Sequence, residues 1–408
     1  MKILVLNAGS STQKSCLYDL SDDAAPDMPA TPVWEGLIDW THQGEAAEIR
    51  VETADGKTLK KVVPTDDRAK VIADLLHTLC QGDTRVIDSF AAIDLVGHRV
   101  VHGGAEYREC TRITPAVKEA IARLAVFAPV HNPVNLEGIE AIERILGDVP
   151  QFAVFDTAFH HTLPATAYVY PGPYDWLEQG IRRYGFHGIS HQYVSQRAAQ
   201  LLGQPLTSLR LITCHLGNGC SVTAVREGRS VETSMGFTPL EGLMMGSRSG
   251  SIDPGILIHL LRQGHTPDDL DRVLNQESGL KGISGLSNDM RHIHAAIAAG
   301  NERAALAFDL FIHRLQTAVS GMLPSLGGLD VLVFTAGIGE NDPLVWSGLC
   351  RGFEFLGLKL DPDRLQRSPD DQEISAPGSR VRVLVIHTHE DWAIAQTCLR
   401  LYSTSQRQ

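Results

Sequence analysis

The sequence predicts an α/β protein built from two related domains, and two observations indicate this fold class. Short apolar segments typical of strands alternate with longer segments that carry helix caps, an order typical of α/β folds. In addition, an apolar strand, a glycine-rich polar turn and a second strand occur twice, in LVLNAGSSTQKSCLYDL near residue 3 and in LITCHLGNGCSVTAVREGRSV near residue 209. This repeat predicts a duplicated domain with a cleft between the two copies.

The elements can be placed along the chain from apolar runs and caps. Strands are expected at residues 3–6, 15–20, 94–101, 151–156, 209–216, 219–225, 331–337 and 381–387. Helices are expected at residues 114–127, 132–147, 253–264, 266–277 and 390–402, the first four opening with the cap residues Thr114, Asn132, Asp253 and Thr266, each followed by proline. The segment 361–380, rich in Asp, Pro and Ser, is expected to be an exposed loop.

Composition narrows the class of protein. The chain has 408 residues, 43% of them hydrophobic, which is enough for a large core and two or three domains. A formal net charge of −12 without a block of like charges argues against nucleic acid or an anionic membrane as a partner. Seven cysteines without a C-x-x-C pair indicate reduced thiols, and we recognise neither a signal sequence nor a membrane span. We therefore expect a soluble cytoplasmic protein.

Three polar, glycine-rich turns follow apolar strands, at residues 7–12, 215–221 and 334–341. Glycine lets a ligand approach the main chain, and successive N–H groups in such a turn bind anions. In the first turn Ser10, Thr12 and Lys14 add hydroxyls and a positive charge, although this turn alone fits a polar hairpin equally well. The chain has neither a P-loop nor a G-x-G-x-x-G sequence. A nucleotide held by hairpin turns explains the three turns together.

These turns belong to a larger set of segments that resembles the acetate kinase family, within the superfamily of sugar kinases, heat-shock chaperones and actin. The 18-residue run TSMGFTPLEGLMMGSRSG from Thr233 is the most specific match. The other matching segments, in family order, are NAGSS (7–11), GHRVVHGG (97–104), HNPVNLEGI (131–139), FDTAFH (155–160), RYGFHGISH (183–191), HLGNGCS (215–221), SGLSNDMR (284–291) and TAGIGEN (335–341).

The resemblance implies a reversible, direct in-line transfer of the ATP γ-phosphoryl group to acetate, giving acetyl phosphate and ADP, with Mg²⁺ for which Mn²⁺ can substitute. It implies two actin-like (ribonuclease H-like) domains, each a mixed sheet flanked by helices. The first would cover residues 1–157, completed by the C-terminal helix at 390–408. The second would cover residues 158–389, bind the nucleotide and form the contact of a homodimer.

The chemistry of such a reaction needs charge more than proton transfer. A short carboxylic acid is already ionised at pH 7, so no general base is required. The obstacle is the repulsion between two anions, which fixed positive groups overcome. By resemblance Arg99 and Arg248 bracket the phosphoryl group and the carboxylate, and their apolar or glycine-rich settings argue against simple surface arginines.

Further roles also come from the resemblance. His187 would contact the phosphoryl oxygens, and His131 would lie in the same pocket. Asp156 would position His187 or the arginines, or hold metal-bound water; a turn or cap role is the alternative. Asn7 and Glu390 would hold Mg²⁺, and His389 beside Glu390 departs from the family pattern.

The nucleotide contacts implied by the resemblance lie in the three turns and in one further segment. They are Ser10, Thr12, Lys14, His215, Leu216, Gly217, Asn218, Gly219, Asp289, Met290, Arg291, Gly337, Ile338, Gly339, Glu340 and Asn341.

The acyl pocket would be formed by Val101, Val130, Phe186 and Pro239. Val130 stands where the family usually has Leu, so the pocket would have slightly more room, and we expect appreciable use of propionate beside acetate. Propionate kinase, or a broader short-chain carboxylate kinase, is therefore the alternative reading. A nucleotide-driven interaction protein is a second alternative, but it gives no role to Arg99 and Arg248.

Overall fold

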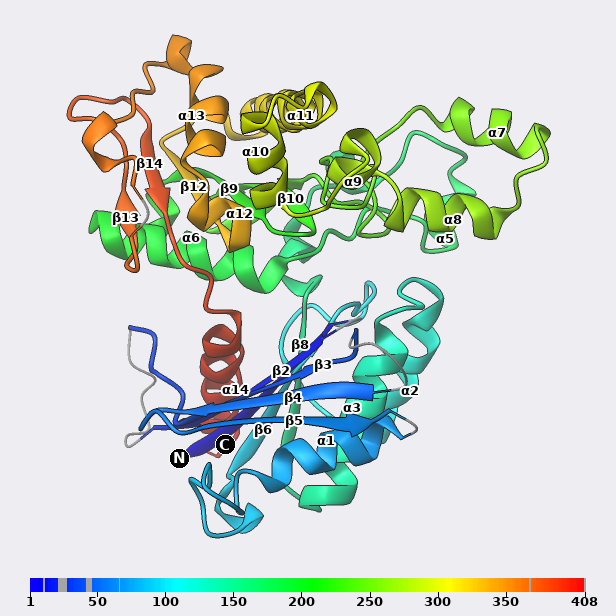
Figure 1. Ribbon diagram of the computed structural model, residues 1–408, viewed down its shortest axis with the longest axis vertical. Helices are drawn as coiled ribbons and strands as arrows, with labels where there is room; N and C mark the ends of the chain where they lie inside the picture. Colours follow the sequence, from blue (N-terminus) through cyan, green and yellow to red (C-terminus); the bar gives the residue numbers. More distant parts are fainter. Residues whose placement is uncertain (10–11, 21–27, 42–45, 66, 367, 407–408) are drawn as a thin grey trace. The chain divides into compact units, whose positions relative to one another are not determined.

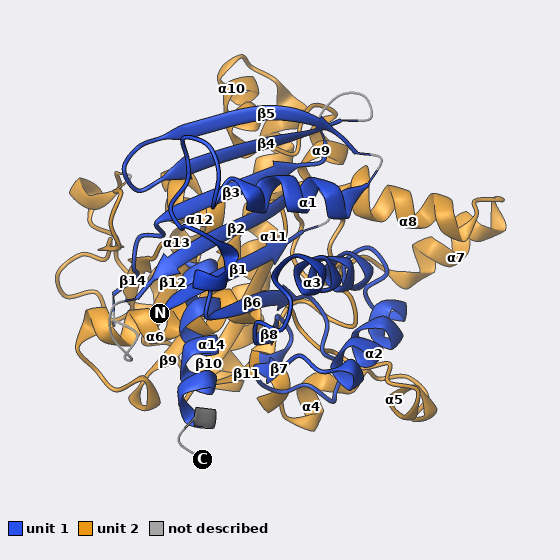
Figure 2. Ribbon diagram, turned by 90° about the horizontal axis from the view of Figure 1, so that it is seen from below, with its two compact units in different colours: residues 1–158, 389–408 blue, residues 159–388 orange. Residues whose placement is uncertain are grey.

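The computed structural model describes residues 1–9, 12–20, 28–41, 46–65, 67–366 and 368–406 (Figure 1). The chain divides into two compact units, which Figure 2 shows in different colours. Unit 1 comprises residues 1–158 and 389–408, and unit 2 comprises residues 159–388. In the described ranges, no helix is both long enough and apolar enough to cross a membrane.

Unit 1 is built on a mixed sheet. Its strands are β1 (Lys2–Ala8), β2 (Thr12–Asp19), β3 (Trp34–Asp39), β4 (Ala46–Thr53), β5 (Thr58–Pro64), β6 (Leu95–Val100), β7 (Thr111–Arg112) and β8 (Gln151–Phe155). They lie in the order β5-β4-β3-β2-β1-β6-β8-β7. Strands β1 to β5 pair antiparallel in succession, whereas β6 runs parallel to β1 and β8 runs parallel to β6.

Helices cover both faces of this sheet (Figure 1). They are α1 (Arg68–His77), α2 (Pro115–Arg123), α3 (Asn132–Leu146) and α14 (Glu390–Gln406). Helices α1 and α3 share an apolar core with Leu6 and Val96 on one face. Successive residues of a strand point to opposite faces of the sheet. Gly97, the residue after Val96, therefore faces α14, and a Cβ on Gly97 would lie 2.8 Å from Cys398 Sγ. The C-terminal helix therefore packs directly on the backbone of β6.

Unit 2 repeats the topology around a second mixed sheet. Its strands are β9 (Arg210–Leu216), β10 (Cys220–Arg226), β11 (Arg229–Thr233), β12 (Val331–Thr335), β13 (Gln372–Glu373) and β14 (Arg382–Val385). They lie in the order β11-β10-β9-β12-β14-β13. The part β11-β10-β9-β12-β14 has the same order and directions as β3-β2-β1-β6-β8 in unit 1. The two units therefore share the repeated strand–turn–strand arrangement that the sequence predicts.

Unit 2 has helices that flank its sheet and others that extend away from the sheet (Figure 1). They are α4 (Ala165–Tyr168), α5 (Asp175–Glu178), α6 (Gly188–Leu202), α7 (Pro254–Arg262), α8 (Pro267–Gln276), α9 (Gly279–Ser284), α10 (Met290–Ala298), α11 (Glu302–Leu326), α12 (Ala336–Asn341) and α13 (Pro343–Arg351). Helix α6 packs against β9 and β12, and α11 packs against β9, β10 and β11.

The predicted helix caps are observed with one exception. Thr114 accepts a hydrogen bond from a backbone N–H of α2, and Thr266 forms a capping box at α8. The prediction that Asn132 caps α3 is wrong, because His131 is the residue at the N-cap position. The Asn132 side chain is instead buried, accepts from the N–H of His102 and donates to its carbonyl group.

The prediction that residues 361–380 form an exposed loop is also wrong. It contains β13, and Ile374 within it is fully buried. Asp371 anchors the segment to α6 through an ion pair of 2.7 Å with Arg197 Nε. A second difference concerns the strand expected to reach residue 337, since β12 stops at Thr335 and the glycine-rich residues after it form α12.

Candidate site residues lie where parallel strands end, because parallel strands bring their carboxyl ends to one edge of a sheet. In unit 1 Asn7 lies on β1, Arg99 on β6 and Asp156 directly after β8. In unit 2 Gly217 follows β9 and Gly337 lies in the helix after β12. Each unit thus gathers polar residues from separate segments at one edge of its own sheet.

Two buried histidines of unit 1 predict how stability depends on pH. Burial lowers the pKa of both His98 and His102 to about 4, whereas a histidine in an unfolded chain has a pKa near 6.5. Between these values the unfolded chain binds more protons, so the free energy of unfolding should fall as the pH is lowered. The expected loss is up to about 1.4 kcal/mol per pH unit for each histidine.

Urea unfolding at about pH 7, 6 and 5 measures this slope. His98→Gln is the matched variant, because an amide can keep the contact of His98 Nε2 with Gln151 Oε1, which is 2.6 Å long, but cannot titrate. Its slope should be shallower than that of the wild type. An unchanged slope would show that His98 does not contribute in this way.

Candidate functional site

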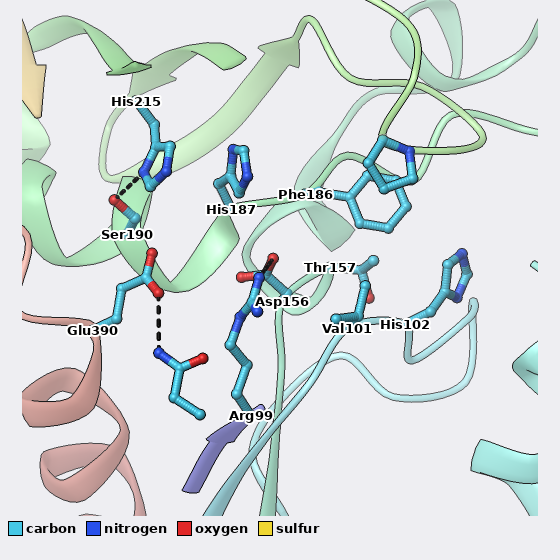
Figure 3. A network of polar contacts seen from close by, with 12 residues as sticks. Arg99, Val101, His102, Asp156, Thr157, Phe186, His187, Ser190, His215 and Glu390 are labelled. Carbon is cyan, nitrogen blue, oxygen red and sulfur yellow. Dashed lines mark hydrogen bonds and ion pairs between the residues drawn. The ribbon is translucent and has the colours of Figure 1, made fainter. Parts of the chain in front are cut away.

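Arg99 and Asp156 form a buried ion pair in unit 1 (Figure 3). Arg99 Nη2 lies 2.9 Å from Asp156 Oδ2, and their side chains are 15% and 1% exposed. The parallel pairing of β6 with β8 sets this contact, since Asp156 N donates to the Val100 carbonyl group. Burial alone would lower the pKa of Arg99, but the carboxylates of Asp156, Glu390 and Asp391, with Asp156 the largest contributor, together raise it. Arg99 is therefore a fixed positive charge.

Asn7 and Glu390 are also neighbours in unit 1. Asn7 Nδ2 lies 3.4 Å from Glu390 Oε2 and 3.1 Å from Asp391 Oδ1, so the amide turns its nitrogen toward both carboxylates. Lys14 Nζ in turn lies 3.2 Å from Asp391 Oδ2 and 2.9 Å from Glu35 Oε2. Burial alone would lower the pKa of Lys14, but the carboxylates of Asp391 and Glu35 raise it above its usual value. Lys14 is thus charged and held beside the predicted metal residues.

The donor groups at this position fit Mg²⁺. Burial raises the pKa of Glu390 to about 7, and the Arg99 guanidinium only partly opposes this effect. A carboxylate that is costly to ionise within the protein gains from a cation beside it. The oxygens of Asn7 and Glu390 are ligands of the kind that Mg²⁺ accepts, and Mg²⁺ takes few protein ligands because it keeps waters and phosphate oxygens.

The remaining predicted residues of unit 1 are more scattered. Val101 is buried directly after β6, whereas Val130 is 59% exposed within unit 1. His131 is the N-cap residue directly before α3, and Thr12 begins β2. Ser10 lies outside the described residues. The acyl-pocket role of Val101 and Val130 stays a prediction.

Arg248 of unit 2 is a partly buried cation without a carboxylate partner. Its Nη1 donates to the Pro239 carbonyl group at 3.3 Å. Among the described residues, no carboxylate lies within ion-pair distance of Arg248. Burial accordingly lowers the pKa of the guanidinium. Because a buried charge is costly unless it is paired, this position is suited to an anionic ligand.

His187 faces the same point as Arg248, beside the bare backbone of Gly219. A Cβ on Gly219 would lie 3.3 Å from Arg248 Nη1 and 3.5 Å from His187 Nε2. His187 has a φ of 57°, a left-handed conformation that is uncommon for a residue other than glycine. Such conformations persist where the surrounding structure enforces them, often at functional sites. The three residues together form a compact site with positive character.

The predicted His215 packs against His187 in unit 2. Their rings stack with centroids 4.0 Å apart, and His215 Nδ1 lies 2.8 Å from Ser190 Oγ (Figure 3). Phe186, predicted for the acyl pocket, is buried, and Pro239 is half-buried. Three predicted residues, His187, His215 and Arg248, are therefore brought together within one unit.

A cavity of about 730 Å³ lies in unit 2 and takes its walls from three polar segments. Its volume lies within the range of about 300–1,000 Å³ that is usual for small-molecule sites. The lining includes many predicted nucleotide residues, namely Gly217, Asn218, Asp289, Met290, Arg291, Gly337, Ile338 and Asn341. The structure thus gathers these residues, from the second and third turns and from the segment at 289–291, around one cavity.

The other predicted nucleotide residues of unit 2 lie away from the lining. Leu216 is the buried end of β9, and Gly339 O accepts a hydrogen bond from Trp346 Nε1 at 2.6 Å. Glu340 Oε1 accepts from the N–H groups of Ala336 and Thr388, at 2.8 Å each. Glu340 therefore ties α12 to the segment after β14. Its predicted nucleotide role remains a prediction.

Sequence reasoning missed part of the cavity lining. Asn288, His294, Asp342, Pro343 and Leu344 also line it. His294 Nε2 lies 2.7 Å from Asp342 Oδ2, and Asp342 also caps α13. Asn288 lies inside a segment that matches the family, so its place in the site could have been predicted from the sequence. His294 could be found only after Met290 was placed at the start of α10, because residues i and i+4 share a helix face.

Gly219→Ala is expected to impair the site without unfolding the protein. The backbone of Gly219 is compatible with alanine, but the added methyl would occupy the point that Arg248 Nη1 and His187 Nε2 both face. We expect the turnover number to fall at least about tenfold, since a displacement of about 1 Å at a reacting centre can cost 10²-fold. Gly321→Ala in α11 is the matched control, because no atom lies within 4 Å of its new Cβ. Equal steady-state rates for both variants would contradict the prediction.

Comparison with known proteins agrees with the sequence resemblance. The model of the acetokinase family matches residues 2–396. The acetate kinase of Cyanothece sp. is 62% identical over 408 residues and covers 100% of both chains. The acetate kinase of Nostoc punctiforme is 61% identical over 402 residues, which are 98% of this chain and 99% of the relative.

Solved structures give the same result for the fold. The acetate kinase of Porphyromonas gingivalis is similar with a TM-score of 0.91 at 38% identity, covering 98% of this chain and 99% of that one. A propionate kinase from Francisella tularensis is similar with a TM-score of 0.87 at 36% identity, covering 97% and 98%. The predicted fold, two actin-like sheets flanked by helices, is confirmed. A family match over nearly the whole length, together with relatives of this identity, shows that the chain belongs to the acetokinase family.

Proposed function

We propose that the chain catalyses reversible, Mg²⁺-dependent transfer of the γ-phosphoryl group of ATP to acetate, giving acetyl phosphate and ADP. Family membership supports this proposal. The single structural observation that carries it is Arg248, a partly buried guanidinium that has no carboxylate partner among the described residues and that faces one point together with His187 Nε2. Such a group is suited to an anion that arrives and leaves, which a phosphoryl group does.

The reaction needs no general base. Acetate is ionised at pH 7, so one of its oxygens can attack the γ-phosphorus directly. The new bond forms in line as the bond between that phosphorus and the bridging oxygen of ADP breaks. Arg248 and His187 offset the repulsion between the two anions, and the sequence resemblance assigns the same task to Arg99. When bound through Asn7 and Glu390, Mg²⁺ supplies further positive charge to the phosphates.

Unit 2 is the nucleotide-binding unit in this proposal. The cavity of about 730 Å³ provides the volume, and its lining includes the glycine-rich segments at 217–218 and 337–338.

Unit 2 also provides the contact of a homodimer. Helix α7 supports this part, since Ile256, Ile258 and Leu261 are all at least 44% exposed. Light scattering should give twice the mass of one chain, which is 44.5 kDa.

Trapping of acyl phosphate by hydroxylamine tests the proposal directly. With ATP, Mg²⁺ and acetate, the protein should form acetyl hydroxamate, and omission of any of the three should abolish it. Binding of ATP without hydroxamate above that of a mock preparation would contradict the proposal. That outcome would favour a nucleotide-driven interaction protein.

Propionate kinase is the second candidate, because Val130 stands where the family usually has a larger Leu. A series of acids from acetate to butyrate should show appreciable kcat/KM for propionate. Val130→Leu should then lower kcat/KM for propionate relative to acetate, by about tenfold for one methylene. An equal or higher relative use of propionate by the variant would remove Val130 from the acyl pocket.

A further inference from the structure

A line of hydrogen bonds runs behind His187 into the core of unit 2. Ser221 Oγ lies 2.8 Å from His187 Nδ1 and 2.7 Å from His191 Nε2. His191 Nδ1 in turn lies 2.7 Å from Thr213 Oγ1. Ser221, His191 and Thr213 are fully buried. A buried polar network of this kind is costly unless every member is satisfied, so its geometry is strongly restricted.

We propose that Ser221 and His191 are positioning residues, which hold the His187 ring with its proton on Nδ1 and thereby present Nε2 to the phosphoryl group. The inference rests on the proposed function, because it assigns a task to His187 in that reaction. The position of the proton on His187 Nδ1 follows from the number of protons available along the line of hydrogen bonds.

His191 carries only one ring proton. Burial lowers its pKa well below the usual value, and the nearby imidazoles of His160 and His215 add to the effect. Those two rings lie 5.9 Å and 6.2 Å away between centroids, and the His187 ring lies 6.5 Å away. The remaining polar contacts of the His191 ring are hydroxyl groups, Thr213 and Ser221. The ring is therefore neutral, with one N–H donor and one acceptor nitrogen.

The direction of the line is set at its far end. Thr213 Oγ1 donates to the Thr223 carbonyl group at 3.4 Å, which uses its only proton. Thr213 therefore accepts from Nδ1–H of His191, and Nε2 of His191 is left as an acceptor. Ser221 donates its single proton to that nitrogen. Ser221 must then accept from the neighbouring ring, which places a proton on His187 Nδ1.

This arrangement fixes what His187 can do at the other nitrogen. Nε2 lies 3.5 Å from the point beside Gly219 that Arg248 also faces. With Nδ1–H already committed to Ser221, a second proton on Nε2 makes the ring an imidazolium. A His187 that takes this second proton from solvent would donate to a phosphoryl oxygen as a cation and add its charge to that of Arg248. Stacking on His215 and the left-handed backbone hold the same ring plane.

Ser221→Ala tests the proposal, because it removes the hydroxyl that links the two rings. We expect kcat to fall about 10- to 100-fold, by analogy with the loss of a partner that orients a metal-binding histidine. The KM for ATP should stay within about twofold, because the cavity lining is unchanged. Ser221→Thr keeps a hydroxyl and should recover most of the lost kcat.

Ser230→Ala is the matched control. Ser230 Oγ lies 2.8 Å from Nδ1 of His160, and both residues are buried, so the same kind of bond is lost outside the line. This variant should lose comparable thermal stability while kcat stays within about twofold of the wild type. A fall in kcat equal to that of Ser221→Ala would mean that the loss reflects general destabilisation, and would overturn the proposal.

The proton itself can be observed by ¹⁵N spectroscopy of histidine-labelled protein, with His187→Gln to assign the signal. In the wild type His187 Nδ1 should carry a proton, and this restraint should be lost in Ser221→Ala. A wild-type His187 with a bare Nδ1 would overturn the proposal even if no Ser221 variant folds. A failure of the proposed function would be seen in a different measurement, because in that case the wild type would form no acyl hydroxamate. If the wild type is active and Ser221→Ala is equally active, only this inference is contradicted.

Discussion

Replacing Arg248 with alanine is expected to lower the turnover number by about 10³- to 10⁵-fold, the range found for arginines that stabilise phosphoryl transfer. The guanidinium has no carboxylate partner among the described residues, so its charge is available to the transferring group. Removing it restores the repulsion between the two anionic reactants. The nucleotide cavity does not include Arg248 in its lining, so ATP should still bind. Steady-state rates and titration calorimetry with ATP measure the two effects separately.

Two further variants make this prediction specific. Arg248→Lys keeps the charge but loses the planar fork that can bind two oxygens, so it should recover only part of the rate. Arg229→Ala removes an exposed arginine from β11 in the same unit and should leave the rate unchanged. Undiminished turnover by Arg248→Ala would refute the role given to this residue.

The sequence was most informative where function and local structure use the same residues. A glycine-rich turn after an apolar strand can be recognised locally, and the turn at 217–219 occurs at the predicted place, whereas residues 337–339 lie within α12. The convergence of Asn7, Arg99 and Asp156 also follows from a local rule, because each lies at or directly after the carboxyl end of a parallel strand. The order and direction of the strands in the sheet then bring these residues to the same edge.

Strands with mixed burial were harder to predict. Strand β5 is largely exposed and reads TLKKVVP, so it has no apolar run. Strand β3 alternates buried and half-buried residues in only six positions, which is a short signal. In the described part of the segment 361–380 one apolar residue, Ile374, is buried together with Ser375, and their neighbours are mostly polar. In these places pairing with neighbouring strands outweighs composition.

Other contacts between distant segments have no local signal in the sequence. Lys14 was expected to bind phosphate, and its local setting gives no sign of the ion pair with Asp391 on the last helix. His191 was one of 17 histidines and lies within a matched segment, yet nothing local singles it out. Its importance depends on Thr213 and Ser221, which β9 and β10 bring to it across the sheet. Such networks need tertiary structure before they can be read.

Asp156→Asn is the second variant for which we expect a large effect, a loss in turnover of about 10²-fold or more. Asparagine keeps an oxygen that can accept from Arg99 Nη2, which lies 2.9 Å from the native carboxylate. It removes the negative charge that holds Arg99 in place, and hydrogen bonds to a charged partner are stronger by about 1–2 kcal/mol than neutral ones. The buried guanidinium would then be free to shift toward other carboxylates, and Glu390 is one whose charge already acts on it. Rates with saturating ATP and acetate measure the loss.

Asp371→Asn separates loss of positioning from loss of stability. Asp371 forms a comparable ion pair with Arg197, and the two side chains are 10% and 11% exposed. Neither residue is assigned to the reaction. Both variants should unfold at lower temperature, because each leaves a buried arginine without its charged partner, but only Asp156→Asn should lose turnover. The pH profile decides the remaining question about Asp156. Acetate enters ionised, so no limb of the wild-type profile should disappear in Asp156→Asn; a limb that does disappear would identify Asp156 as a titrating base and contradict the mechanism.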